Sequence, residues 1–290
     1  MSDTLNAKED VEILADKDPG VGLPGRVYLP GYSRTMGPQS HLFAERERLQ
    51  SLTWEHFDVK QLSPTIGAEL VGLDLSQELT DEVVSEIQQA LWDYKVIFFR
   101  NQEITSEEQL RFAQRFGELE IHPFLPPNTE TPELVRFEKN ANAAGYENQW
   151  HHDVTWRETP SQGAILRAIE IPPIGGDTLF VDANAAYEGL TQERKDEIDS
   201  LNAVHDFLRA FGRQVPKEKL AEMREMYPLV KHPVVINHHQ TGKPLLYVNR
   251  IFVNGIEGYD EKEGFELIDA LCREFEVLEY SCRFKWEKNS

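Results

Sequence analysis

The apolar residues of this chain gather into short runs that are unevenly spaced along the sequence, and this pattern limits the folds that it can adopt. Such runs suit buried strands, which are predicted at residues 96–99, 134–137, 164–169, 179–181, 234–236 and 245–248. The last two are joined by a predicted hairpin turn at residues 239–243. Strands and helices do not alternate regularly around a glycine-rich phosphate loop, which disfavours a doubly wound nucleotide-binding fold. The pattern indicates an antiparallel sheet or barrel core with helices around it.

Two helices are well signalled early in the chain. Thr80 can cap a segment whose apolar residues recur at helical spacing up to Leu91. Thr105 and Glu108 form a capping box for a second helix, with Gly117 as its expected stop. Further helices are predicted at residues 185–190, 193–198, 217–226 and 263–275.

The domain organisation follows from a change in composition near residue 52. Residues 1–52 are rich in Asp, Glu, Lys, Gly and Pro and have only isolated apolar positions, which predicts a polar N-terminal arm. Residues 53–290 continue without a long linker or an internal repeat, so we expect one domain there.

The charge of the chain excludes some partners. The 290 residues include 50 Asp and Glu against 30 Lys and Arg, a formal net charge of −20, which disfavours nucleic acid as a partner. A small anionic substrate is not excluded, because a few cationic side chains in a pocket can override the global field. The sequence has no secretory signal, no apolar run near the ~20 residues of a membrane span, and only two cysteines. We therefore expect a soluble cytoplasmic protein without a membrane partner.

The densest group of metal-capable side chains lies at residues 151–153, His-His-Asp. In an extended strand the side chains of His151 and Asp153 point to the same face and supply two donors of a divalent metal site. Two histidines and one carboxylate on one face are the ligands of many non-haem Fe(II) oxygenases. The same residues could instead belong to a solvated loop or a turn cap, because His-x-Asp is a short motif.

The surrounding sequence adds to this motif. Residues 150–156 read WHHDVTW, followed by ETP at 158–160, GAILRA at 163–168 and GGDTLF at 175–180. These motifs closely resemble the Fe(II)- and α-ketoglutarate-dependent taurine dioxygenase family. The resemblance covers about residues 57–287 and also includes residues 67–75, 96–100, 112–117, 121–123, 205–207, 232–235, 241–243 and 248–249.

The resemblance implies a mainly β fold with flanking helices, a double-stranded β-helix or jelly-roll-like barrel that holds iron at its mouth. It implies Fe(II) and O2, with α-ketoglutarate as co-substrate. By position, His151 and Asp153 resemble the first two iron ligands, and Thr178 resembles the hydroxyl that binds an α-ketoglutarate carboxylate. His152 is expected to face outward and not to bind metal.

The resemblance also implies a substrate pocket. His122 resembles the contact to the substrate sulfonate, and Val154, Phe211 and Phe252 resemble the pocket wall. Without the resemblance, the apolar residues would be assigned to the core, His122 to a loop and Thr178 to a strand-end turn. His205 and His232 match family motifs in which they are expected to be structural.

Two substitutions put taurine itself in doubt. Leu125 stands where the best-understood members have a tyrosine that holds taurine, and Glu147 stands where they have an asparagine. A longer or more apolar alkylsulfonate, or a sulfate ester, would suit Leu125 better, and Glu147 could contact an amine.

The family pattern also predicts a C-terminal segment with a second histidine ligand and anion-binding arginines, which have no counterpart before Ser290. We therefore expect residues 53–290 to be a C-terminally incomplete dioxygenase domain that lacks its last strands. The expected reaction is hydroxylation of taurine or a related small anionic organosulfur compound, releasing sulfite or sulfate with succinate and CO2. One alternative is a truncated or degenerate inactive paralogue that acts as a binding or interaction protein. A zinc hydrolase is disfavoured by the absence of an HExxH motif, and a homo-oligomer is left open.

Overall fold

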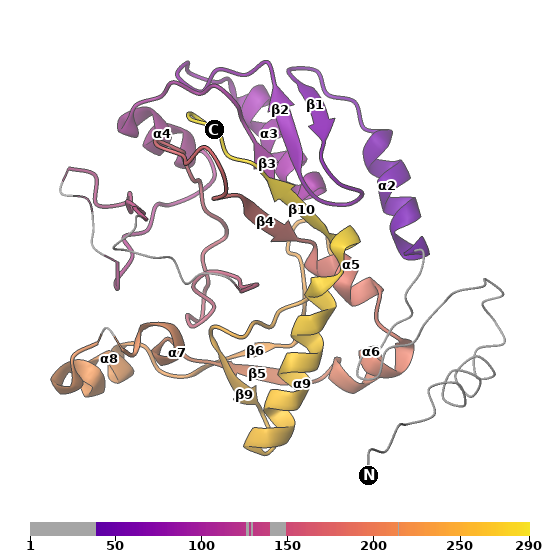
Figure 1. Ribbon diagram of the computed structural model, residues 1–290, viewed down its shortest axis with the longest axis vertical. Helices are drawn as coiled ribbons and strands as arrows, with labels where there is room; N and C mark the ends of the chain where they lie inside the picture. Colours follow the sequence, from indigo (N-terminus) through magenta and orange to yellow (C-terminus); the bar gives the residue numbers. More distant parts are fainter. Residues whose placement is uncertain (1–38, 126–127, 129, 140–148, 214) are drawn as a thin grey trace, which may run out of the picture.

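The computed structural model describes residues 39–125, 128, 130–139, 149–213 and 215–290. A pair of strands, β4 (Thr178–Val181) and β10 (Ser281–Phe284), lies at the centre of Figure 1. One small sheet lies above this pair and another below it, and the chain between the upper helices and β4 runs along the left side (Figure 1). The described strands form sheets of two or three strands, antiparallel in all but one pairing.

The upper part combines a three-stranded sheet with two helices. Its elements are β1 (Asp58–Gln61), β2 (Ala68–Val71), α3 (Asp81–Tyr94), β3 (Ile97–Phe98) and α4 (Ser106–Ala113). The Thr80 side chain accepts the Val83 N–H at the start of α3, and Thr105 and Glu108 form a capping box at the start of α4, which confirms both predicted N-termini. The second helix ends at Ala113, ahead of the expected stop at Gly117.

A further helix precedes this sheet and corrects the expected extent of the polar arm. A short 3-10 turn (Ser40–Leu42) leads into α2 (Phe43–Gln50). Leu42 and Leu49 are 5% and 1% exposed. The Tyr94 hydroxyl donates to the Leu49 carbonyl over 3.2 Å, and Arg48 donates to Asp93 over 2.8 Å. Leu42 and Leu49 are isolated in the sequence, but each packs into a core cluster and together they anchor this segment. Residues 40–50 are therefore not part of a solvated arm.

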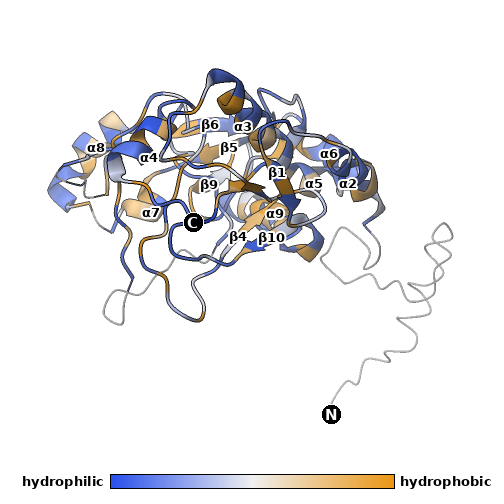
Figure 2. Cartoon of the chain, turned by 90° about the horizontal axis from the view of Figure 1, so that it is seen from above, coloured by the Kyte–Doolittle hydropathy of each residue, from blue (hydrophilic) through white to orange (hydrophobic). Residues whose placement is uncertain are grey.

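The lower part contains the second three-stranded sheet and most of the remaining helices. Its sheet is β5 (Asn202–His205) between β6 (Val230–Pro233) and β9 (Val253–Ile256), and β7 (Val235–Asn237) and β8 (Pro244–Leu246) form a hairpin. Its helices are α5 (Ala183–Glu188), α6 (Gln192–Ile198), α7 (Leu208–Phe211), α8 (Leu220–Met226) and α9 (Glu261–Arg273), with 3-10 turns at Lys217–Lys219, Glu274–Glu276 and Leu278–Tyr280. The helices carry both apolar and polar residues along their length (Figure 2), and they turn the apolar ones, such as Ile268 and Leu271, into the core. The predicted hairpin and the four later helices are thus confirmed to within a few residues.

The central pair joins the two parts. Phe284 of β10 pairs with Thr178 of β4, and its ring stacks on Phe98 of β3 with 3.8 Å between centroids. Ile66 and Cys282 complete this small core. β10, which is distant in sequence, therefore packs its Phe284 side chain against the sheet that lies above it.

Three sequence expectations differ from the structure. Residues 134–137 and 164–169 are not strands, and Ile165, Leu166 and Ile169 are 40–58% exposed. An apolar run becomes a strand only where a neighbouring strand completes its hydrogen bonds, and no described strand pairs with these runs. The fold is also not mainly β in the described residues, because the strands have two to four residues whereas α3 and α9 have 14 and 13. None of the described helices has the length and apolarity to cross a membrane.

Candidate metal centre

His151 and Asp153 converge on one point. His151 Nε2 lies 3.3 Å from Asp153 Oδ1, and both side chains are accessible, being 31% and 66% exposed. His151 Nδ1 lies 2.8 Å from the Gln149 carbonyl oxygen, to which it donates. Nε2 faces Asp153: it donates to the carboxylate while the ring is protonated, and loss of that proton leaves a lone pair on Nε2 for a metal ion.

The segment achieves this arrangement without being a strand. Residues 149–152 are irregular and a turn begins at Asp153, but the side chains still alternate in direction. The hydrogen bond from the His151 side chain keeps the pKa of Asp153 below its usual value, so the carboxylate is ionised at neutral pH. An imidazole nitrogen and a carboxylate oxygen are suitable donors for Fe(II), and the pair therefore fits two ligands of an iron site.

His152 points the opposite way from the expected direction. Its ring packs 5.0 Å from that of Tyr247, and its Nδ1 is buried without a hydrogen-bond partner among the described residues. Burial lowers the pKa of His152 to about 4. The prediction that His152 faces outward is wrong, because the protein interior lies behind His151 and Asp153.

A third protein ligand is not found in the part of the chain that the structure describes. There, no group of three or more His, Cys, Asp and Glu side chains is arranged to hold a metal. The expected second histidine ligand and the expected C-terminal continuation stay predictions.

His122 is oriented by the loop that follows it. Its Nδ1 accepts the backbone N–H groups of Phe124 and Leu125, each over 3.2 Å, so the ring proton lies on Nε2. Burial lowers the pKa of His122, which keeps the imidazole neutral. A neutral ring with a fixed Nε2–H can donate to an anionic oxygen.

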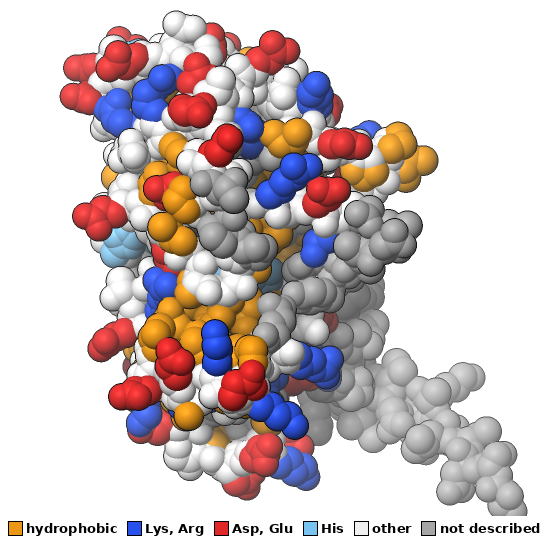
Figure 3. Space-filling view, turned by 90° about the vertical axis from the view of Figure 1, so that its left-hand side faces the viewer, with side chains coloured by type: hydrophobic (Ala, Val, Ile, Leu, Met, Phe, Trp, Pro, Cys, Tyr) orange, Lys and Arg blue, Asp and Glu red, His pale blue; other side chains and the backbone are white. Residues whose placement is uncertain are grey.

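The three expected pocket-wall residues come together in one apolar cluster. Val154 and Phe252 are buried in it with Trp156 and Phe207, and Phe211 packs against them at 5.6 Å from the His122 ring. The face that carries α7 and α8 has apolar side chains at its centre with charged ones around them (Figure 3).

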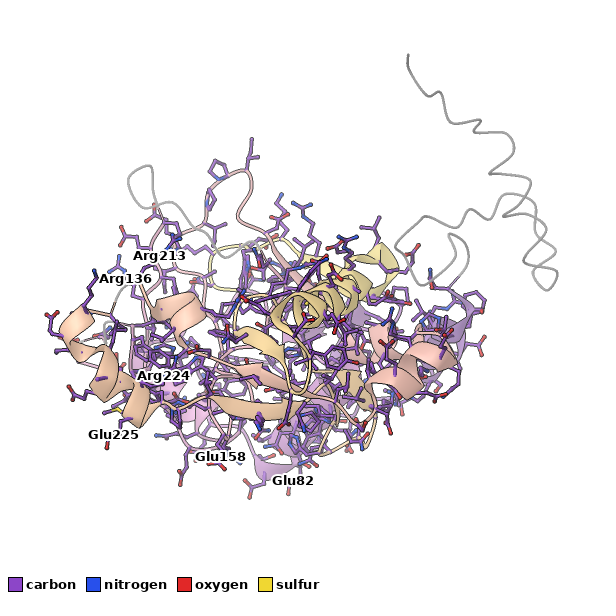
Figure 4. The ribbon with its side chains drawn as sticks, turned by 90° about the horizontal axis from the view of Figure 1, so that it is seen from below. Glu82, Arg136, Glu158, Arg213, Arg224 and Glu225 are labelled. Carbon is purple, nitrogen blue, oxygen red and sulfur yellow. The ribbon has the colours of Figure 1, made fainter. Side chains whose placement is uncertain are left out.

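Helix α8 is tied to this cluster by one arginine. Arg224 belongs to α8 (Figure 4). It donates to Asp206 over 2.9 Å, and its guanidinium lies 5.3 Å from the centre of the Phe207 ring. Helix α8 thus covers the apolar cluster, which includes Val154, the residue after Asp153.

Three further predicted site residues are Thr178, Leu125 and Glu147. Thr178 Oγ1 accepts the indole N–H of Trp286 over 2.8 Å, which leaves the hydroxyl proton free to donate to a carboxylate. The described contacts of Thr178 are with Phe284 and Trp286 and not with His151 or Asp153. Leu125 is half-buried beside His122, and Glu147 lies outside the described residues.

Sequence reasoning missed the polar groups behind the turn that begins at Asp153. His205 Nδ1 lies 2.9 Å from Thr155 Oγ1, and His232 Nε2 lies 2.9 Å from the carbonyl oxygens of both Thr155 and Arg157. Both histidines belong to motifs in the sequence, but only the fold reveals that they meet this turn.

Comparison with known proteins identifies a family. Residues 58–290 match the model of the family described as "Taurine catabolism dioxygenase TauD, TfdA family". An α-ketoglutarate-dependent sulfate ester dioxygenase of Pseudomonas putida is 34% identical over 79% of this chain and 78% of its own. An alkylsulfatase of Acinetobacter baylyi is 32% identical over 81% of this chain and 75% of its own.

A solved structure extends the comparison to the fold. A taurine dioxygenase from Burkholderia xenovorans superposes with a TM-score of 0.69 at 34% identity, over 81% of this chain and 78% of its own. The similarity confirms the expected jelly-roll class of fold at the level of the family. It also confirms the expected α-ketoglutarate-dependent dioxygenase that uses Fe(II) and O2. The chain belongs to the TauD, TfdA family of taurine catabolism dioxygenases.

Proposed function

We propose that this protein is an Fe(II)- and α-ketoglutarate-dependent dioxygenase that acts on an alkyl sulfate ester or a long-chain alkylsulfonate. The observation that carries the proposal is the accessible pair of His151 Nε2 and Asp153 Oδ1, 3.3 Å apart, followed at once by Val154 in an apolar cluster. Fe(II) bound there would supply the activation of O2 that couples decarboxylation of α-ketoglutarate to hydroxylation of the substrate.

Each side chain of the site has its own role in the proposed reaction. His151 and Asp153 hold the metal from one side, and Thr178 offers a hydroxyl proton to the co-substrate carboxylate. The Nε2–H of His122 donates to an oxygen of the sulfate or sulfonate. Hydroxylation of the carbon next to that group gives a product that breaks down to an aldehyde and sulfate or sulfite, while α-ketoglutarate is converted to succinate and CO2.

The apolar cluster favours a hydrocarbon tail over the short aminoethyl chain of taurine. Val154, Phe211 and Phe252 offer apolar contact, and Leu125 lacks the phenol that the best-understood members have at this position. Burial of each methylene contributes about 0.8 kcal/mol. Two relatives, a sulfate ester dioxygenase and an alkylsulfatase, support the same substrate class.

The experiment measures α-ketoglutarate-dependent O2 uptake and succinate formation with hexyl sulfate, octyl sulfate, pentanesulfonate and taurine. We expect kcat/KM to rise about fourfold per methylene until the apolar region is filled, since each contributes about 0.8 kcal/mol. Octanoate is the matched control, because it has a similar tail but no sulfur oxyanion. A preference for taurine, or equal turnover of octanoate, would contradict the proposed substrate. Uptake that no organosulfur compound stimulates would contradict the proposed function.

The remaining expectations form part of this proposal. We assign catalysis to residues 53–290 and place the enzyme in the cytoplasm, where α-ketoglutarate is available. Glu147 is proposed to contact the substrate side of the site, and a homo-oligomer stays a prediction to be tested by light scattering.

A further inference from the structure

The turn that begins at Asp153 has an unfavourable backbone. Val154 has φ of 58°, in the left-handed region, which a β-branched side chain rarely adopts. The Arg157 N–H donates to the Val154 carbonyl over 3.1 Å and closes the turn. One such bond does not hold a strained residue, so surrounding contacts must determine this conformation.

Those contacts come from two histidines on the buried side. His232 Nε2 lies 2.9 Å from the Thr155 carbonyl oxygen and 2.9 Å from that of Arg157, and it donates to both. His205 Nδ1 lies 2.9 Å from the Thr155 hydroxyl, and Asn249 Nδ2 lies 3.5 Å from the same oxygen. Thr155, His205 and Asn249 are at most 1% exposed, so water does not replace these bonds readily.

The two histidines are themselves held by a sheet. His232 of β6 pairs with Ala203, two residues before His205 on β5, so both side chains leave the same face. Their rings lie 4.9 Å apart, and the Tyr247 ring packs against both. The three-stranded sheet of the lower part therefore provides a fixed frame for the turn.

We propose that His232 and His205 are positioning residues that hold the turn at residues 153–157 so that His151 and Asp153 present their donor atoms to one metal ion. The inference rests on the proposed metal site and adds the residues that support this site from its buried side. Loss of either bond lets Val154 return to an ordinary backbone conformation, and Asp153 then turns away from His151.

Variants at these positions separate hydrogen bonding from packing. His232→Phe keeps a ring but removes the donor, whereas His232→Gln retains an N–H near the position of Nε2 and should rescue the phenotype. Thr155→Val removes the partner of His205 with little change of shape, and it serves if His232→Phe does not fold. Val234→Ala is the matched control. Val234 is fully buried and directly follows β6, but it packs in the core cluster that contains Ile268 and Leu271.

The first measurement is anaerobic titration of each metal-free protein with Fe(II) and with Co(II), whose visible absorption reports the coordination. We expect a 10- to 100-fold weaker affinity for His232→Phe and Thr155→Val, near-wild-type affinity for His232→Gln, and unchanged affinity for Val234→Ala. Wild-type affinity in both His232→Phe and Thr155→Val would overturn the inference, as would an equal loss in Val234→Ala at the same thermal stability.

The second measurement is hydrogen exchange without metal. Peptides that contain residues 151–157 should exchange faster in His232→Phe and Thr155→Val, with peptides from β1 and β2 unchanged. Unchanged exchange at 151–157 overturns the positioning role even if the metal site is correct. Conversely, a wild-type protein that binds neither metal contradicts the proposed metal site, while the exchange data still decide whether the histidines hold the turn.

Discussion

Replacement of His122 by asparagine separates recognition of the substrate from support of its loop. Asparagine Oδ1 can take the place of His122 Nδ1 and accept the N–H groups of Phe124 and Leu125, which the imidazole accepts at 3.2 Å. Asparagine has no group at the position of Nε2–H, so only the proposed bond to the substrate oxyanion is lost. Hydrogen bonds to charged groups contribute about 1.5–3 kcal/mol, which corresponds to about a 10- to 150-fold loss of kcat/KM.

The assay is succinate formation from an alkyl sulfate over a range of substrate concentrations, together with thermal unfolding of each variant. His122→Asn should unfold close to the wild-type temperature. His122→Phe leaves both backbone N–H groups without their acceptor and should in addition lose about 1–3 kcal/mol of stability. An unchanged kcat/KM in His122→Asn would refute the assigned contact, and a loss of stability equal to that of His122→Phe would refute the separation of the two roles.

Three other predictions test the site, the fold and a buried neutral histidine. His151→Ala and Asp153→Ala should each abolish tight anaerobic Fe(II) binding, and titration curves like that of the wild type would remove both residues from the site. Leu49→Ala should lower the free energy of unfolding measured in urea by about 2–5 kcal/mol, and Phe43→Ala by less than about 0.5 kcal/mol. The reason is that Leu49 is 1% and Phe43 is 47% exposed. Equal losses would contradict the packing of α2 against the core. Burial lowers the pKa of His205 from 6.5 to about 3, so the unfolded chain takes up a proton that the native chain does not. Stability should therefore fall as the pH drops below 6.5 towards 3, and a denaturant midpoint that stays constant over this range would contradict the burial.

Local interactions account for what the sequence predicted well. The caps at Thr80 and Thr105 act within three residues, and the turn between β7 and β8 closes through the His238 N–H and the Lys243 carbonyl. The pairing of His151 and Asp153 is similarly local.

The misses depend on distant partners. β1 (Asp58–Gln61) is polar at most positions and becomes a strand only through β2, and β10 requires β4, about a hundred residues earlier in the chain. The apolar run at residues 164–169 pairs with no described strand and stays irregular. The roles of His205 and His232 could not be derived either, because the sheet brings them to a turn at least 50 residues away in sequence.

The central strand pair has a consequence for how this protein is made. Of the described elements, β10 leaves the ribosome last, yet its Phe284 fills the space beside Phe98 in the first sheet to be synthesised. Residues 289 and 290 then bond to the backbone of Gln102 and Ala168. The apolar side of the early sheet around Phe98 therefore stays exposed while nearly two hundred further residues are translated. We expect the nascent chain to be a client for chaperones during that interval, and refolding from denaturant to be slow because its decisive contact spans most of the sequence.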